Sequence, residues 1–410
     1  MSKINIGLFV DTFYPMIDGV IMVVDNYAKR LSKYANVYVF APASPGEVYD
    51  DTKFNYNVIR CKSLGLSFID YSLPIPDLDS TFKNDLRGIK LDIVHIHSPF
   101  TVGRMGINYA VKHNIPLVAT FHSQYRQDFY RATKTNFLSN HLTRAIIKMF
   151  NKCDECWTMN KAMADIFYKE YGYKTMPKII NNATDMEPIK DTKESNKKID
   201  KEYDIKKDEK VLLYTGRINK LKNIDLIIES LTHIKNTKYK MLLVGSGQDE
   251  RYFNNLIDKY KLNDKVIMCG KILNRKMLAE YYARADLFLF PSMYDSNSLV
   301  QIEAASQKTP TLFVKDSATS YYIKDNINGY IEENNSIKYA KRIEEILADE
   351  KKLKEVSENA FKELYISWDE EVKNIYNEYL RLMPKHWKNT KIITNTYQLK
   401  KELNDFNKKN

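Results

Sequence analysis

Two carboxylates, Asp295 and Glu303, lie eight residues apart in the stretch DLFLFPSMYDSNSLVQIEAASQK. The apolar run that ends at Pro291 is typical of a buried strand, and the apolar spacing after Ser298 predicts a helix. Ser298, followed three residues later by a glutamine, has the pattern of a helix cap. Backbone N–H groups at a helix N-terminus bind phosphate, and carboxylates accept hydrogen bonds from hydroxyls. The stretch therefore indicates a ligand with sugar, phosphate and sugar in series; the alternative is that both acids merely face solvent.

Two cations, Arg217 and Lys222, lie five residues apart in the stretch LLYTGRINKLKNIDLIIESL. Its pattern predicts a strand, a glycine-containing turn and a helix. Paired cations at the end of a strand can hold a diphosphate and stabilise its charge as it departs. The helix dipole opposes cations at a helix start, so a bound anion would relieve that opposition. An ordinary basic loop is the alternative.

Two residues of the N-terminal half have comparable positions. Gly19 precedes an apolar helical pattern, and a residue without a side chain there lets the backbone approach a ligand. His122 comes directly after the strand-like run PLVATF, so its side chain is expected at the carboxyl edge of a sheet. A purely structural role is the alternative for both residues.

Short apolar runs alternate with helix-length stretches in both halves of the chain. The runs are INIGLFV, VYVFAP, DIVHIH, PLVATF and ECWTM in the first half, and KVLLYTG, KMLLVG, KVIMCG, ADLFLFPS and PTLFVK in the second. Continuous apolar runs between helices predict parallel strands that are buried on both faces. Each half is therefore expected to form a doubly wound, Rossmann-like α/β domain, and the carboxyl ends of the two sheets are expected to face each other across a cleft.

The expected domain boundaries follow from charge and periodicity. A segment dense in charge indicates a solvated linker, and ISWDEEVKNIYNEYLRLM has the apolar spacing of an amphipathic helix. The expected divisions are an N-terminal domain over residues 1–188, a charged linker over 189–209, a second domain over 210–365, a helix over 366–383 and a basic tail over 384–410. We expect the tail to be loosely held and dispensable for folding.

Composition narrows the class of protein. The chain has 410 residues, 44% of them hydrophobic, and a net charge of +11, of which the seven lysines of residues 384–410 supply a large part. No interleaved aromatic and basic stripe indicates nucleic-acid binding. Four cysteines, no signal peptide and no apolar run of about 20 residues predict a soluble protein of the reducing cytoplasm. We expect Cys153 and Cys156 of the sequence CDEC to be ordinary thiols, because no second ligand pair accompanies them.

Taken together, these stretches resemble the retaining glycosyltransferases of family 4, over roughly residues 1–383. The matching motifs are PMIDGV around Gly19, TFHSQY around His122, the G-R-x4-K spacing of Arg217 and Lys222, Asn328-Gly329, and the E-x7-E spacing of Asp295 and Glu303. The sequence departs from the family where Asp295 replaces a glutamate, where Asn297-Ser298 replaces Phe-Gly, and where NNATD replaces the P-N-G-x-D turn. The resemblance implies the glycosyltransferase B (GT-B) fold, in which the helix over 366–383 packs back on the first domain.

The resemblance also implies a nucleotide-sugar donor and a role for each site residue. Glu303 would bind the ribose, Asp295 the sugar hydroxyls, and Arg217 and Lys222 the diphosphate. The remaining donor contacts would come from the backbone of Ser298 and Leu299, from Gly270 and Ile272 beside the base, and from Gly19 and His122 of the first domain. No metal and no cofactor is implied, because fixed cations neutralise the leaving diphosphate.

The implied reaction is transfer of a hexose, with UDP-glucose the favoured type of donor, to a lipid or glycan acceptor at the cytoplasmic face of the membrane. Residues 126–152 carry six basic residues and helical apolar spacing at Leu142, Ile146, Met149 and Phe150. This pattern predicts either a peripheral helix on an anionic membrane surface or one packed on its own domain. Two alternatives to a transferase are a non-catalytic nucleotide-sugar-binding partner of another transferase and a nucleotide-sugar epimerase on the same fold.

Overall fold

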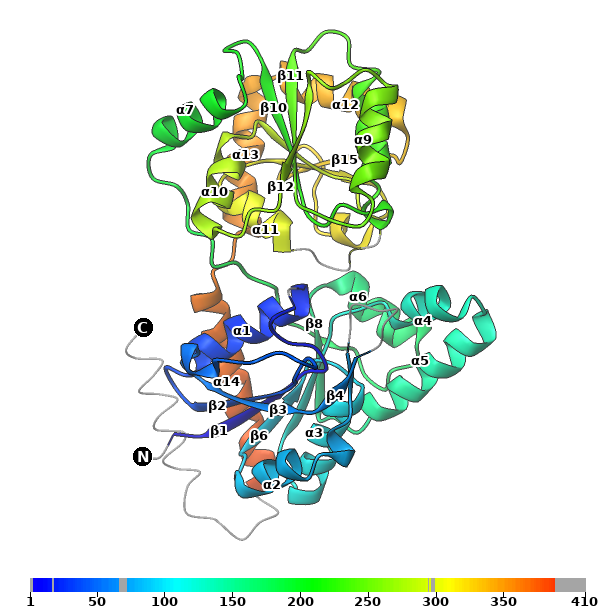
Figure 1. Cartoon of the computed structure of the whole chain (residues 1–410), viewed down its shortest axis with the longest axis vertical. Coiled ribbons are helices and arrows are strands. Elements are labelled where there is room, and N and C mark those ends of the chain that lie inside the picture. Colours follow the sequence, from blue (N-terminus) through cyan, green and yellow to red (C-terminus); the bar gives the residue numbers. More distant parts are fainter. Residues whose placement is uncertain (1–2, 17, 66–71, 294, 296–298, 388–410) are drawn as a thin grey trace. The chain divides into compact units, whose positions relative to one another are not determined.

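The computed structural model of the chain describes residues 3–16, 18–65, 72–293, 295 and 299–387, with side chains as far as residue 383. The chain divides into two compact units (Figure 1). Unit 1 comprises residues 1–181 and 368–410, and unit 2 comprises residues 182–367. Most of the expected basic tail lies outside the described residues.

Unit 1 contains a parallel sheet of seven strands in the order β3-β2-β1-β6-β7-β8-β9. The strands are β1 (Asn5–Phe9), β2 (Asn36–Pro42), β3 (Asn57–Cys61), β6 (Ile93–Ile96), β7 (Leu117–Phe121), β8 (Glu155–Thr158) and β9 (Lys178–Ile179). A short antiparallel pair, β4 (Ser63–Leu64) and β5 (Leu73–Pro74), lies outside this sheet. All residues of β6 and β7 are buried, as expected for parallel strands covered on both faces.

Most helices of unit 1 connect strands of this sheet, whereas the last one follows unit 2 in the sequence. The helices are α1 (Gly19–Leu31), α2 (Ser80–Gly88), α3 (Thr101–His113), α4 (Tyr125–Thr133), α5 (Asn136–Phe150), α6 (Lys161–Asp165) and α14 (Trp368–Trp387). Asp18 begins α1 by accepting a hydrogen bond from the backbone N–H of Ile21 at 2.9 Å.

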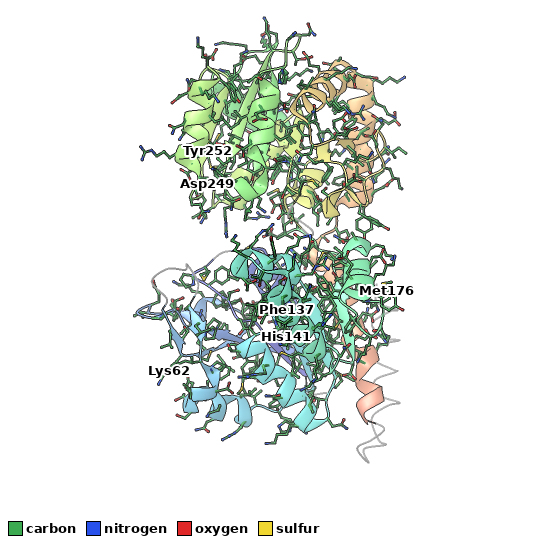
Figure 2. All side chains as sticks on the ribbon, turned by 90° about the vertical axis from the view of Figure 1, so that its right-hand side faces the viewer. Lys62, Phe137, His141, Met176, Asp249 and Tyr252 are labelled. Carbon is green, nitrogen blue, oxygen red and sulfur yellow. The ribbon has the colours of Figure 1, made fainter. Side chains whose placement is uncertain are left out.

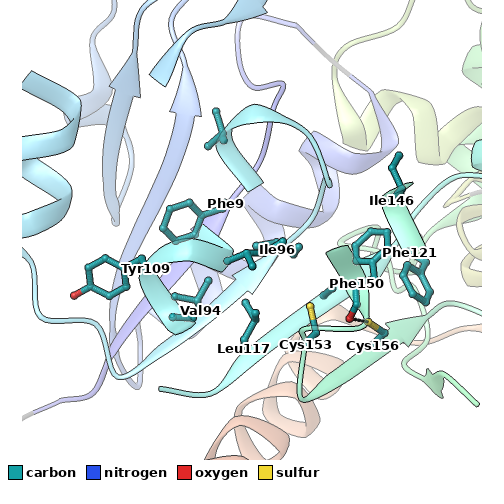
Figure 3. Packing of buried hydrophobic residues seen from close by; sticks show 14 of the residues in the cluster. Phe9, Val94, Ile96, Tyr109, Leu117, Phe121, Ile146, Phe150, Cys153 and Cys156 are labelled. Atoms are coloured by element: carbon teal, nitrogen blue, oxygen red, sulfur yellow. Dashed lines mark hydrogen bonds between the residues drawn. The ribbon is translucent and has the colours of Figure 1, made fainter. Parts of the chain in front are cut away.

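The core of unit 1 includes both cysteines of the CDEC sequence. Phe121 and Phe150 pack edge to face beside them, with ring centroids 4.5 Å apart (Figure 3). Cys153 and Cys156 are both buried, and burial raises the pKa of the Cys153 thiol well above its ordinary value. A thiol that stays protonated is a poor nucleophile and a poor metal ligand, so Cys153 serves as a core residue. Cys156 packs in the same apolar cluster.

Helix α14 belongs to unit 1 although it follows unit 2 in the sequence. It packs on α1 (Figure 1). Its Tyr379 hydroxyl lies 2.6 Å from Nδ1 of the buried His95. The Tyr379 ring also stacks on Trp157 at 5.6 Å. The helix runs to Trp387, so its expected end at residue 383 is wrong. Pro384 removes one backbone donor but does not stop a helix whose preceding turn is held by buried residues such as Met383.

Unit 2 contains a parallel sheet of six strands in the order β12-β11-β10-β13-β14-β15. The strands are β10 (Lys210–Thr215), β11 (Tyr239–Val244), β12 (Val266–Gly270), β13 (Leu287–Phe290), β14 (Thr311–Val314) and β15 (Tyr330–Glu332). Leu212 and Tyr214 of β10 pack in one apolar cluster, whereas Val211 and Leu213 pack in another. Both faces of the sheet are therefore covered, as the continuous apolar runs predicted.

Seven helices are described in unit 2. They are α7 (Thr192–Glu202), α8 (Ile224–Leu231), α9 (Glu250–Lys259), α10 (Arg275–Arg284), α11 (Leu299–Ser306), α12 (Ser336–Ala348) and α13 (Glu350–Leu364). The order of strands corresponds to the 3-2-1-4-5-6 order of the Rossmann fold. No helix of the described residues is long and apolar enough to cross a membrane.

The charged segment over 189–209 is part of unit 2, so the expected linker is wrong at this point. Most of it forms α7, which packs on α10 through the buried Ile199. Ion pairs at both ends of the contact join Lys198 to Glu280 at 2.7 Å and Asp200 to Arg284 at 2.5 Å. The buried Ile199, the Tyr203 and Ile205 side chains that follow the helix, and complementary charges dock a helix whose other faces are solvated.

Replacing Tyr379 with Phe tests how α14 is held. The change leaves Nδ1 of the buried His95 without its partner, which should lower the free energy of unfolding by about 1–3 kcal/mol. All three tryptophans lie in unit 1, so their fluorescence during urea denaturation follows this unit. The control is Tyr130→Phe, on an exposed side chain of α4. Equal stability of the two variants would show that the Tyr379–His95 contact does not anchor the helix.

Candidate functional site

The predicted charged residues of unit 2 follow two neighbouring strands of the sheet. From β10 the chain continues to β11 on one side, whereas β13 lies on the other side of β10. Ligands of open parallel sheets bind at such a switch point, beyond the carboxyl ends of the strands. Arg217 and Lys222 follow β10, and Asp295 and Glu303 follow β13. All four therefore belong to the connections that leave the switch point, and Lys222 and Asp295 are in direct contact.

Backbone contacts shape the loop that carries Arg217. Gly216 has a φ of +150°, and the N–H of Ile218 donates to the Ser246 carbonyl at 2.9 Å. A Cβ on Gly245 would lie 1.8 Å from the Gly216 carbonyl oxygen, and one on Gly247 would lie 2.1 Å from that of Ile218. The loops after β10 and β11 therefore pack backbone against backbone. The glycine spacing of VGSG was a sequence signal for this contact that was not recognised.

Further along the same loop, side chains tie it to its neighbours. Asp249, at the start of α9, accepts from the backbone N–H of Lys220 at 2.9 Å (Figure 2). Asn223 has left-handed backbone angles, with a φ of 57°, and its side-chain amide donates to the Pro291 carbonyl at 3.0 Å. The loops after β10 and β13 are thereby joined directly.

Lys222 and Asp295 form an ion pair in which Nζ lies 2.5 Å from Oδ1. Both side chains are largely buried, with exposed fractions of 19% and 16%. Among the described residues, the second carboxylate oxygen of Asp295 has no hydrogen-bond partner although it is buried. Arg217 is exposed and forms no ion pair with a described residue. Of the two cations, Lys222 is therefore paired with a carboxylate, whereas Arg217 has no anionic partner among the described residues.

Glu303 is only 4% exposed, which rules out the alternative of a solvent-facing acid. Its Oε2 accepts from the Tyr282 hydroxyl at 3.1 Å, and its Oε1 lies 2.8 Å from Arg275. Tyr282 also shares a hydrogen bond with Thr215, the last residue of β10. The carboxylate is thus held from two sides, and each of its oxygens keeps a lone pair for a further donor.

Arg275 was missed by the sequence analysis. It is the first residue of α10, after the cap residue Asn274, where the helix dipole opposes a cation. It also pairs with Asp185 at 2.7 Å. Burial alone would lower the pKa of its guanidinium, but Glu303 and Asp185 raise that pKa above its ordinary value. A basic residue at the start of a helix was a weak local signal that carboxylates lie nearby.

The other predicted donor contacts of unit 2 lie at the same edge or outside the described residues. Gly270 ends β12 with a φ of +71°, and Ile272 follows it and packs on the core. Leu299 is the first residue of α11. Ser298, the predicted cap of that helix, lies outside the described residues.

In unit 1, Gly19 and His122 both lie at the carboxyl edge of the sheet. Gly19 is the first residue of α1, and a Cβ added to it would meet no atom within 4 Å. His122 directly follows β7, and its Nε2 lies 3.1 Å from Nδ1 of His97, which directly follows β6. Burial lowers the pKa of His122 to about 3, so the imidazole is neutral at physiological pH. His97 was not singled out from the sequence.

Helices α4 and α5 show how the predicted amphipathic stretch is used. Ile146 and Phe150 are buried in the core, and Met149 packs against it. The apolar stripe therefore packs on its own unit, as one of the two alternatives predicted. Phe137, at the start of α5, is instead 84% exposed (Figure 2).

Comparison with known proteins gives the family. Residues 17–188 match the family model described as Glycosyltransferase Family 4, and residues 195–363 match the one described as Glycosyl transferases group 1. The chain belongs to the family 4 glycosyltransferases, and the GT-B fold and transferase class predicted from the sequence are confirmed. The epimerase and the non-catalytic partner gain no support from these matches.

Two curated relatives are alpha-monoglucosyldiacylglycerol synthases. The protein from Acholeplasma laidlawii is 27% identical over 345 residues, which cover 79% of this chain and 84% of the relative. The protein from Streptococcus pneumoniae is 24% identical over 335 residues, which cover 79% and 74%.

Solved structures share the fold at lower identity. HepE from Anabaena, in complex with UDP and glucose, has a TM-score of 0.73 and 15% identity, and the match covers 92% of this chain and 99% of that one. Sucrose-phosphate synthase from Thermosynechococcus elongatus has a TM-score of 0.77 and 19% identity, with coverages of 93% and 100%. At such identities the structures establish the fold alone.

The ionic link between Arg275 and Glu303 can be measured by a double-mutant cycle. Arg275→Met leaves Glu303 buried without its cation and should destabilise unit 2 by about 1–3 kcal/mol, less than for a fully buried pair because Arg275 is 35% exposed. In Arg275→Met, adding Glu303→Gln should restore part of the loss, because it removes the unpaired charge. Hydrogen exchange of peptides from β13 and α11 measures the change.

The matched control for this cycle is Arg251→Met, on an exposed arginine of α9. It should leave hydrogen exchange in β13 and α11 unchanged. Strictly additive effects of Arg275→Met and Glu303→Gln would mean that the two side chains do not interact in solution.

Proposed function

We propose that this chain is a retaining glycosyltransferase that moves a hexose from a nucleoside-diphosphate sugar, of the UDP-glucose type, to a lipid or glycan acceptor at the cytoplasmic face of the membrane. The observation that carries the proposal is the ion pair of Lys222 with Asp295 at the switch point of the unit 2 sheet, where Arg217 and Glu303 belong to the same two connections after β10 and β13. Cations suit a diphosphate, and carboxylates suit the hydroxyls of a ribose and a hexose.

Each of these residues has a separate task in the proposed reaction. Glu303 accepts hydrogen bonds from the ribose hydroxyls while Arg275 and Tyr282 hold its orientation. Arg217 and Lys222 stabilise the negative charge that develops on the departing diphosphate, so the proposed reaction needs no metal and no cofactor. Asp295 accepts from the transferred hexose.

The remaining donor contacts are proposed from the loops around these groups. The backbone at Ser298 and Leu299 binds phosphate and sugar, and Gly270 and Ile272 flank the base. Gly19 and His122 are the contacts from unit 1. UDP and glucose in the HepE complex, and the synthase activity in the names of the two curated relatives, support this choice of donor and reaction.

A lipid acceptor is supported by the surface of α4 and α5 as well as by the relatives' names. We define the α4–α5 surface as the exposed side chains between Arg126 and Lys152. Four of its cations form no ion pair with a described residue: Lys134, Arg144, Lys148 and Lys152. Phe137 and Leu138 are 84% and 42% exposed beside them. Cations attract anionic headgroups, and an exposed aromatic side chain inserts at their boundary with the acyl chains.

A transfer assay tests the proposed function. The full chain is incubated with UDP-glucose and diacylglycerol in vesicles, then with a panel of other nucleotide sugars and glycans. The proposal predicts release of UDP and an α-glucosylated product, because retention keeps the α configuration of UDP-glucose. Release of no nucleoside diphosphate with any donor, or a β-linked product, would contradict it.

Two variants separate the tasks of the carboxylates in this reaction. A charged acceptor that binds a neutral hydroxyl contributes about 1.5–3 kcal/mol, so Glu303→Gln should weaken UDP binding roughly tenfold to a hundredfold. Asp295→Asn should leave the affinity for UDP nearly unchanged but impair the binding or transfer of the hexose. Calorimetry with UDP and with UDP-glucose distinguishes the two effects. UDP affinity of Glu303→Gln equal to that of the wild-type chain would refute the ribose assignment.

Vesicle flotation tests the α4–α5 surface. The chain should bind vesicles that contain phosphatidylglycerol, and binding should fall when salt screens the cations. Phe137→Ser should weaken binding about tenfold or more, because burying a Phe side chain contributes roughly 1.5–3 kcal/mol. Leu78→Ser is the matched control, since Leu78 is 79% exposed in unit 1 but outside this surface. Equal losses in both variants would exclude a specific contact through Phe137.

A further inference from the structure

His97 and His122 form a pair of imidazoles that the proposed function uses only in part. β6 and β7 are neighbouring parallel strands, and the two histidines are the first residues after them. Their rings stack at an interplanar angle of 25° with centroids 5.4 Å apart, and His97 Nδ1 lies 3.1 Å from His122 Nε2. His97 is 1% exposed, whereas His122 is partly exposed. The buried ring therefore contacts a ring that is partly exposed.

The two imidazoles share their hydrogen bond as neutral groups. Burial lowers the pKa of His97 well below its ordinary value and that of His122 to about 3. Each ring then carries a single N–H, so one of the two facing nitrogens donates and the other accepts. Which one donates decides the tautomer of both rings.

The surroundings of His97 favour one of these tautomers. Among the described residues, its Nε2 has no hydrogen-bond partner although it is buried. If His122 donated to Nδ1 of His97, the proton of His97 would lie on Nε2, as a buried N–H without an acceptor. Orphaned buried N–H donors are rarer than under-satisfied acceptors, and a donor without a partner costs free energy on folding. With the proton on Nδ1, His97 instead donates it to His122.

We propose that His97 is a positioning residue that donates from Nδ1 to Nε2 of His122 and thereby fixes the proton of His122 on its other nitrogen, Nδ1. A ligand that meets Nδ1 of His122 then meets a neutral hydrogen-bond donor. Oxygen atoms of a hexose or a phosphate can accept from such a donor, whereas the opposite tautomer would present a lone pair to them. The pairing of the two rings is inferred from their geometry, whereas the nature of the ligand rests on the proposed function.

Nitrogen-15 NMR of the full chain tests the tautomers directly. Two-bond proton–nitrogen correlations distinguish protonated from bare ring nitrogens, and single variants assign the seven histidines. The expected spectrum has Nδ1 protonated and Nε2 bare in both His97 and His122. In His97→Leu, the signals of His122 should shift toward a mixture of tautomers. A protonated Nε2 on His122 in the wild-type chain, or unchanged His122 signals in His97→Leu, would overturn the proposal.

Two further variants separate positioning from folding. His97→Asn places an amide donor near the former Nδ1, so it should restore the His122 signals. His95→Asn is the control, because His95 is equally buried on β6 but bonds Thr120 and Tyr379. It should leave the His122 nitrogen signals in place even if it lowers stability. Failure of His97→Asn to restore the signals, or an equal shift in His95→Asn, would show that His97 acts only through packing.

The transfer assay adds a functional readout. Turnover should fall about tenfold in His97→Leu, the size expected for one lost hydrogen bond, and recover in His97→Asn. The two proposals fail in different ways. The predicted spectra without any glycosyl transfer would refute the function and leave the histidine pair intact, whereas transfer by a chain with Nε2-protonated His122 would refute the pair alone.

Discussion

A buried carboxylate at the carboxyl edge of the unit 2 sheet constrains the residues around it. Glu303 is almost inaccessible to water, and an uncompensated charge at such a place costs several kcal/mol. Arg275 and Tyr282 supply the compensation. Because Tyr282 also bonds Thr215 and Arg275 also bonds Asp185, this one charge links β10, α10, α11 and the first residues of unit 2. The stability of these elements and the orientation of the acid therefore have a common cause.

The second acid is held in a different way, and the difference matters for the proposed reaction. Asp295 pairs with Lys222, whose cationic group lies at the end of a long, flexible side chain. A diphosphate that binds at this point offers Lys222 a second anionic partner, so the ion pair must be shared or broken. At the proposed ribose end, the ligand thus meets Glu303, which is already oriented. At the hexose end it meets Asp295, whose ion pair must reorganise. The loop that carries the cations is itself fixed by backbone contacts at Ile218 and by the side chains of Asp249 and Asn223.

The sequence was sufficient for the sheets and for the charged residues of the site. Parallel strands buried on both faces appear as continuous apolar runs, and every residue of β13 is buried. Asp295 and Glu303 were found because they belong to one short stretch of sequence, a loop followed by a helix. Arg275 was not found, because its partner Glu303 is 28 positions away and no periodicity links them. The pairing of His97 with His122 was missed for the same reason, since it depends on two strands being neighbours.

The error at 189–209 has another physical origin. The composition of that segment is dominated by exposed charges, but the burial of Ile199 and two ion pairs dock α7 on α10. Average hydrophobicity cannot detect a helix that is held by so small a contact. The amphipathic stripe of α5 was likewise recognised from the sequence. Whether that stripe packs on its own unit or remains exposed could be decided only from the contacts in the structure.

The central claim is that a nucleotide lies across the switch point between β10 and β13. A crystal structure of the full chain with UDP bound tests it most directly. Ribose hydroxyls are expected within hydrogen-bond distance of the Glu303 carboxylate, and phosphate oxygens within that distance of Arg217 or Lys222. UDP bound elsewhere, with the Glu303 carboxylate still bonded only to Arg275 and Tyr282, would contradict it.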